Sequence, residues 1–173
     1  MTETEHEGDD AWEHAQVGAE LIAEGEHERA VGAMRELLSR DPDNEHASFY
    51  LAAAHFERAE YPEALKAYVR ALEIAPSFLG AMIGSGHTLR MLGRYEQAIR
   101  MAYEVLQRSK EDPDALFLLG ASHFAIGNKD AAEKALERFL ATRPELELAL
   151  EVSGMLQVLR GEIVDAEPAE EPD

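Results

Sequence analysis

Two stretches, EYPEALKAYVRALEIAP (60–76) and GRYEQAIRMAYEVL (93–106), decide the fold because they are two copies of one pattern. Alanine and leucine each keep a spacing of 34 residues over four copies, at Ala30, Ala64, Ala98 and Ala132, and at Leu38, Leu72, Leu106 and Leu140. A fixed period of this length is typical of helix–turn–helix repeats that stack into a solenoid. The sequence therefore predicts an all-α solenoid of four repeats.

Turn residues divide each repeat into a first helix, here called helix A, and a second helix, called helix B. Glycine stands between them at 25, 93 and 127, with Ala59 in that place in the second repeat. Glycine ends helices in this way because it adopts the left-handed conformation at no steric cost. Pro62 then opens a helix B and Asp112 precedes a helix A, as residues of these types do. The predicted repeats are 11–44, 45–78, 79–112 and 113–146, and a closing helix is predicted over 147–160.

Small residues recur where paired helices must approach closely. Gly18, Ala52, Gly86 and Gly120 share one position of the repeat, and the regularly spaced alanines share another. These residues and the two quoted stretches resemble the tetratricopeptide repeat family over about residues 11–161. The two quoted stretches look like helix B of that family. The resemblance implies a right-handed solenoid whose helices A line a concave groove.

Negative charge is concentrated at the two ends of the chain, whose net charge is −19. Residues 1–10 hold five carboxylates and residues 161–173 hold six, and neither stretch contains lysine or arginine. Such segments bury too little apolar surface to offset the entropy of ordering, so we expect disordered acidic tails over 1–10 and 162–173. The charge disfavours nucleic acid and anionic membranes as partners.

The sequence contains no cysteine, no apolar run long enough to span a bilayer and no secretory signal at residues 1–10. Cytoplasm is therefore the expected compartment. The seven histidines lack the spacing of metal ligands, and His55 and His123 stand where the family has a core aromatic residue. We predict no catalytic, metal-binding or cofactor-binding residue, and hence a protein that is not an enzyme.

The resemblance also implies which positions of each helix A face the groove. With a continuation on the closing helix, they hold Trp12, His46, Phe49, Tyr50, Phe56, Gly80, Ile83, Gly84, His87, Arg90, Phe117, Leu118, Phe124, Leu148, Val152 and Met155. Aromatic and aliphatic side chains dominate this set, which is typical of an interface. The alternative is that the groove aromatics pack on one another and belong to the core.

Two groove positions, Gly80 and Gly84, lie within a helix, where glycine costs about 1 kcal/mol relative to alanine. One interpretation is an open pocket between Tyr50 and Phe117 that accepts a bulky side chain of the partner, and the other is sequence drift. Some members of the family clamp a C-terminal carboxylate with polar groove residues. The corresponding positions here hold Ala15, Ala19, Tyr50, Gly80 and Gly84, so no such clamp is predicted.

We therefore expect a non-catalytic interaction module that binds a protein or peptide with an apolar segment in its groove. A second hypothesis is a chaperone like those that hold hydrophobic translocator subunits of type III secretion. It is based on the likeness of residues 143–145 and 152–156 to the C-terminal end of those chaperones. A third hypothesis is a scaffold that self-associates through Leu148, Val152, Met155 and Leu159.

Overall fold

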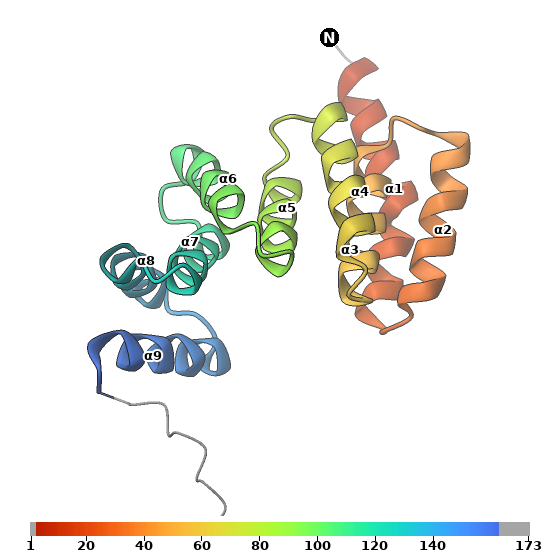
Figure 1. The fold of residues 1–173 in the computed structure, drawn as a ribbon. Coiled ribbons are helices and arrows are strands. Elements are labelled where there is room, and N and C mark those ends of the chain that lie inside the picture. The colour runs from red at the N-terminus through yellow and green to blue at the C-terminus, as the bar shows by residue number, and fades with distance from the viewer. Residues whose placement is uncertain (1–2, 163–173) are drawn as a thin grey trace, which may run out of the picture.

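The computed structural model describes the backbone of residues 3–162 and the side chains of residues 12–162. Within this range the chain forms nine α-helices and no strands, which confirms the predicted all-α solenoid (Figure 1). The helices are α1 (Glu3–Ala23), α2 (His27–Arg40), α3 (Glu45–Glu57), α4 (Tyr61–Ile74), α5 (Leu79–Met91), α6 (Tyr95–Arg108), α7 (Pro113–Ala125), α8 (Lys129–Ala141) and α9 (Leu146–Arg160). Odd-numbered helices are helices A and even-numbered helices are helices B.

The first helix begins earlier than the sequence suggested. We expected a disordered tail over residues 1–10, but α1 already begins at Glu3, so residues 3–10 are helical. Carboxylates in the first turns of a helix interact favourably with the helix dipole, and glutamate has a high helix propensity. The acidic composition of this segment is therefore compatible with a helix that continues from the folded repeat. The predicted C-terminal tail lies outside the described residues from position 163 onward.

One turn structure joins helix A to helix B in every repeat. The residues at the centre of this turn, Gly25, Ala59, Gly93 and Gly127, and likewise Gly161 at the end of α9, all have a φ between 56° and 76°. The residue after each of them donates its N–H to the carbonyl five residues earlier, for example Glu26 to Leu21 at 2.8 Å and Asn128 to His123 at 3.0 Å. This pattern satisfies carbonyls that the helix end would leave free. The predicted role of the glycines is confirmed.

Helix A is capped by a side chain at two of the junctions between repeats. Asn44 accepts a hydrogen bond from the backbone N–H of Ala47 at 2.8 Å, and Asp112 accepts one from Ala115 at 3.0 Å. These contacts satisfy N–H groups of the first helical turn. Phe78 precedes α5 at the same position of the repeat and makes no side-chain cap. Its ring has another role, described below.

Close packing between paired helices depends on the small residues. The regularly spaced alanines, Ala30, Ala64, Ala98 and Ala132, are completely buried. A Cβ atom on Gly120 would lie 2.5 Å from Leu136 Cδ2, and one on Gly18 would lie 2.7 Å from the Met34 sulfur. Helix B side chains therefore occupy the space that a side chain on helix A would need, as expected for a close-packed interior.

Contacts between repeats define an inner and an outer face. Helices A pack on one another, α1 on α3, α3 on α5 and α5 on α7, whereas successive helices B make no comparable contact among the described residues. Elements on the inside of a curved stack lie closer together than those on the outside. Helices A therefore form the inner, concave face and helices B the outer face, along the curved path seen in Figure 1.

Arginines of helix B tie some repeats to the preceding one. Arg70 bonds Asp43 at 2.6 Å, and Arg138, at the same repeat position, bonds Glu111 at 2.9 Å. Each of these arginines also donates to a backbone carbonyl of the same loop. The third repeat holds Glu104 at this position. The junction of the second and third repeats therefore lacks this arginine contact.

The closing helix α9 packs its apolar side against the last repeat. Val152 and Leu156 are buried with Leu116, Leu136 and Phe139, so Val152 belongs to the core and not to the surface of the groove. Leu148, Met155 and Leu159 are partly buried against the same cluster. The proposed self-association face is therefore largely used within the molecule. The reason is that α9 takes the place of a next helix A and must cover the apolar end of the stack.

Within residues 3–162, no helix combines the length and the apolar character that crossing a lipid bilayer requires.

Candidate functional site

The inner side of the first two repeats, up to the residue that precedes α5, carries six aromatic rings in mutual contact. We call them the aromatic cluster: Trp12 on α1, His46, Phe49 and Tyr50 on α3, Tyr68 on α4, and Phe78 at the start of α5. Two successive repeats thus contribute to one cluster, which reaches the start of the third repeat at Phe78. Four of the six residues are among those that the sequence assigned to the groove.

The rings meet mainly edge to face. The ring centroids of Trp12 and His46 are 5.4 Å apart, and those of His46 and Phe78 are 5.3 Å apart, both in T-shaped geometry. Phe49 contacts Tyr50 at 5.1 Å, Phe78 at 5.0 Å and Tyr68 at 5.8 Å. Such arrangements are favourable for aromatic side chains because the positive edge of one ring meets the negative face of another. Phe49 is the centre of the cluster.

Exposure differs across the cluster. Tyr68 is buried, and burial is the main reason why the pKa of its hydroxyl lies above the usual value. His46, Phe49, Tyr50 and Phe78 are half-buried, and Trp12 is 44% exposed. Burial also raises the pKa of the Tyr50 hydroxyl. The rings therefore support one another, as side chains of a core do, and still present apolar surface to solvent.

Tyr68 and Phe78 were not predicted as site residues. Tyr68 belongs to helix B, which the family resemblance assigns to the outer side. Phe78 occupies the position that Asn44 and Asp112 use for helix capping. A large apolar residue cannot cap a helix. That mismatch was the available sequence signal for a different role of Phe78.

The pocket predicted at Gly84 is filled by the protein itself. A Cβ atom at this position would lie 2.3 Å from Cζ of Tyr68 and 2.7 Å from its hydroxyl oxygen. The interpretation of an open pocket is therefore wrong, because a ring from helix B occupies the space. Drift does not describe this glycine either, since a side chain here would collide with Tyr68. Gly80 is also confined, with a Cβ atom placed 3.1 Å from Phe78 and 3.3 Å from Phe49.

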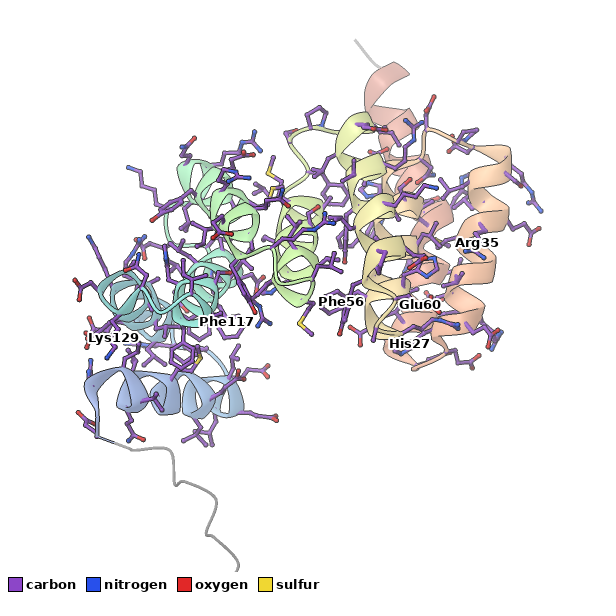
Figure 2. All side chains as sticks on the ribbon, in the orientation of Figure 1. His27, Arg35, Phe56, Glu60, Phe117 and Lys129 are labelled. Atoms are coloured by element: carbon purple, nitrogen blue, oxygen red, sulfur yellow. The ribbon has the colours of Figure 1, made fainter. Side chains whose placement is uncertain are left out.

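A second group of rings links the third and fourth repeats. His87 on α5 stacks on Phe117 of α7 with centroids 6.1 Å apart, and Phe117 contacts Phe139 of α8 at 5.6 Å. Phe117 projects from α7, where it is labelled in Figure 2. Burial, with a smaller effect of the positive charge of Arg90, lowers the pKa of His87 to about 4. His87 is therefore neutral near neutral pH.

The remaining predicted groove residues have mixed positions. Phe56, labelled in Figure 2, contacts the ring of Tyr61 at a centroid distance of 5.5 Å and packs against the buried group that contains Tyr68. Ile83 is partly buried against the core around Met82 and Val105. Phe124 is half-buried and makes no ring contact within residues 12–162. Leu118 is completely buried and is a core residue, contrary to the prediction.

Charged groups are few on this face. The Arg90 guanidinium makes no ion pair within the described part of the chain, and its Nε atom is buried without a hydrogen-bond partner there. Burial, with a further contribution from Asp112, raises the pKa of the Asp114 carboxyl at the start of α7. His55 and His123 are buried away from this surface, and His55 bonds Glu60 at 2.6 Å. Among residues 12–162, no cluster of three or more potential ligands could hold a metal ion.

Comparison with known proteins shows the family to which this fold is similar. A family model described as tetratricopeptide repeat matches residues 21–82 and 89–150. The chain is 30% identical over 122 residues to the CTR9 homolog of Arabidopsis thaliana, covering 70% of this chain and 11% of that protein. It is 27% identical over 160 residues to tetratricopeptide repeat protein 37 of Xenopus laevis, covering 84% of this chain and 10% of that protein. The chain thus spans about a tenth of the length of these curated relatives.

A solved structure of Pseudomonas aeruginosa PilF agrees with the same assignment. It superposes with a TM-score of 0.77 at 25% sequence identity, over 89% of this chain and 71% of that chain. The two ranges matched by the family model include more than half of this chain and all or part of each of the nine described helices, although only residues 21–23 of α1 are included. The chain belongs to the tetratricopeptide repeat family.

Proposed function

We propose that the protein is a non-catalytic interaction module whose inner face binds a protein segment that carries aromatic or aliphatic side chains. The family supports a role in protein–protein interaction. The observation that carries the finer proposal is the aromatic cluster, which spans two repeats and ends in the exposed ring of Trp12. Large, preorganised aromatic side chains supply most of the binding energy at protein interfaces.

The shape of the cluster favours a rigid platform. Each ring is held by at least one neighbouring ring, so little side-chain entropy remains to be lost when a ligand binds. Few charges line this face, and binding should therefore depend weakly on ionic strength. A chaperone for a hydrophobic secreted subunit, as suggested by the C-terminal residues, is one specific form of this function.

The proposal can be tested with peptides selected from a phage-displayed library on the full chain. Trp12 is the single tryptophan, so its emission reports binding at the cluster directly. Trp12→Ala and Tyr50→Ala should each lower the affinity for the selected peptides by about 30-fold or more, which corresponds to a loss of about 2 kcal/mol of binding free energy. Calorimetric titration measures this loss in variants whose helical spectrum matches that of the wild type.

The matched control is Tyr103→Ala, because Tyr103 on α6 is 48% exposed, close to the exposure of Trp12, but lies on the outer face. This substitution should leave the affinity unchanged. Equal affinity of the wild type and Trp12→Ala would place the binding site elsewhere and contradict the proposal.

A second candidate function is self-association through the far side of α9. Leu146 and Leu150 are 75% and 63% exposed and form a short row, because they lie one helical turn apart. This row replaces the face proposed from the sequence, which packs inward. Sedimentation velocity over a hundredfold concentration range should show a dimer that Leu146→Glu with Leu150→Glu abolishes. A monomer throughout would rule this function out.

A further inference from the structure

The outer face contains a groove between α4 and α6, on the side opposite the aromatic cluster. Two cavities of about 310 Å³ and about 470 Å³ lie here, and they share Leu65, Val69 and Arg94 as lining residues. Because three residues line both cavities, the cavities adjoin one another and form one continuous depression. We call it the outer groove. In Figure 1, α5 lies between the two helices that border it.

The repeat architecture explains why the outer groove stays open. Within the described part of the chain, successive helices B make no contact comparable to that between helices A, and residues of α5 line the floor between α4 and α6. At the neighbouring junctions, Arg70 and Arg138 reach from helix B to the loop of the preceding repeat. The third repeat has Glu104 instead, and this side chain lines the groove without an ion pair among the described residues. No side chain of α6 therefore ties the third repeat to the loop before it in this way.

The floor of the outer groove is apolar. It is formed by apolar side chains of α4, α5 and the middle of α6, among them Leu65, Val69, Leu89 and Met101. Val69 is 45% exposed, which is unusual for a branched aliphatic side chain surrounded by other apolar groups. An exposed apolar strip with a polar border is the usual form of a ligand-binding groove.

The border is cationic, in a protein with a net charge of −19. Lys66, Arg94 and Arg100 line the groove, and within residues 12–162 none of them makes an ion pair. Arg70 also lines it, but its charge is engaged by Asp43 and Glu73. Glu104 is the acidic side chain in the groove that has no cationic partner. The unpaired cations therefore outnumber the unpaired carboxylate.

We propose that the outer groove is a second binding site, independent of the inner face, which takes an extended acidic segment of a partner protein. In an extended chain, successive side chains point to opposite sides. Every second residue of such a segment can place an aliphatic side chain on the floor, while the intervening carboxylates meet Lys66, Arg94 and Arg100. Three separated cations over an apolar floor suit a peptide better than a phosphate backbone, which offers no apolar side chains.

The test uses the full chain and a fluorescein-labelled peptide, GEVELEVELEG, followed by anisotropy. We expect saturable binding with a Kd of about 100 µM or below, and affinity that falls steeply with added salt. The charge-reversed peptide GKVKLKVKLKG should not saturate at ten times that concentration. Equal binding of both peptides would overturn the proposal.

Variants locate the site. The double substitution Arg94→Glu with Arg100→Glu should lower the affinity for the acidic peptide at least tenfold. Val69→Asp should lower this affinity to the same extent. The matched control is Lys129→Glu with Lys134→Glu, which makes the same change of charge at two exposed cations of α8 and should alter the affinity less than twofold. Equal weakening by both double variants would show unspecific attraction and overturn the proposal.

Three further results would also overturn it, and each identifies another occupant or site. A lower affinity for the acidic peptide in Trp12→Ala would assign its binding to the inner face. At least tenfold tighter binding after deletion of residues 163–173 would identify the acidic C-terminal segment of this chain as the occupant. Tighter binding of an 11-nucleotide single-stranded DNA than of the acidic peptide would identify a nucleic-acid surface. Unchanged peptide affinity in Trp12→Ala supports the proposal and separates it from the function proposed for the inner face.

Discussion

A glycine inside α5 and a tyrosine of α4 share one volume. At Gly84, an added methyl group would overlap the ring of Tyr68, which is buried and held by Phe49. Helix propensity alone favours alanine at a helical glycine by about 1 kcal/mol. Overpacking a well-filled core costs typically about 1–3 kcal/mol. The steric effect is therefore expected to exceed the propensity gain.

We predict that Gly84→Ala lowers the free energy of unfolding by up to about 2 kcal/mol. The control is Gly32→Ala, since Gly32 lies in the interior of α2 and a Cβ atom there would meet nothing within 4 Å. This control should raise the free energy of unfolding by about 1 kcal/mol. Urea unfolding of both variants measures the two changes.

The same idea predicts coupling between the two residues. Tyr68→Leu shortens the side chain that meets Gly84, so Gly84→Ala should no longer destabilise the protein in that background. Equal effects of Gly84→Ala in both backgrounds would contradict the packing explanation.

His87 makes stability depend on pH in a defined window. Its pKa in the folded protein is about 4, below the usual value of about 6.5, mainly because of burial. The unfolded chain therefore binds the proton more readily than the folded chain. The contribution of His87 to stability is fully present above about pH 6.5 and is lost as the pH falls toward 4.

We predict that His87→Phe, which keeps a ring against Phe117, reduces the acid sensitivity of the protein. When the pH is lowered from 8 to 5, the free energy of unfolding of the wild type should fall by about 2 kcal/mol more than that of the variant. Urea unfolding at both pH values measures the difference. Parallel losses in the two proteins would show that His87 is not the titrating group.

At the scale of the element, the turn between helix A and helix B is the same in all repeats although one residue differs. Ala59 adopts a φ of 56°, in the left-handed region where the other repeats have glycine. A residue with a Cβ atom pays about 1–2 kcal/mol for this conformation, partly offset because glycine leaves the unfolded chain more freedom.

Ala59→Gly should therefore raise the free energy of unfolding by about 0.5–1 kcal/mol. The reverse substitution, Gly127→Ala, should lower it by a similar amount, since a Cβ atom at Gly127 would meet nothing within 4 Å and only backbone strain is added. Thermal unfolding of the two variants checks this symmetry. Stabilisation by Gly127→Ala would show that the turn tolerates a side chain.

At the scale of the whole molecule, charge is the dominant property. The net charge is −19, and the excess carboxylates repel one another more strongly in the compact folded state than in the expanded unfolded state. Ion pairs such as Arg70 with Asp43 and Arg160 with Glu133 are exposed and contribute little. Added salt screens both interactions. It should therefore weaken the repulsion between carboxylates by more than it weakens the attraction within the exposed ion pairs.

We predict that raising sodium chloride from about 20 mM to 300 mM increases the melting temperature by a few degrees, because the Debye length falls well below the size of the molecule. Differential scanning calorimetry measures the shift, with sucrose of equal osmolality as the control. A lower melting temperature at high salt would show that the exposed ion pairs outweigh the repulsion.

The sequence by itself determined the period of the repeats, the turns between helices and the small packing positions. These features are local or strictly periodic: the left-handed turn at Gly93 and the helix cap at Asp112 depend on a few neighbouring residues. The start and the end of α9, Leu146–Arg160, therefore agree with the closing helix predicted over 147–160 to within one residue. The start of α1 does not, because the same acidic composition suits a free tail and the first turns of a helix.

Only the tertiary structure decided which side chains meet across helices. Tyr68 fills the space beside Gly84, Phe78 joins the aromatic cluster from a capping position, and Val152 turns into the core. Each of these contacts joins residues of different helices, and it depends on the curvature and the crossing angles of the stack. A pattern along one helix gives the face on which a residue lies. Whether that face stays open or is covered by another ring follows only from the packing of the whole solenoid.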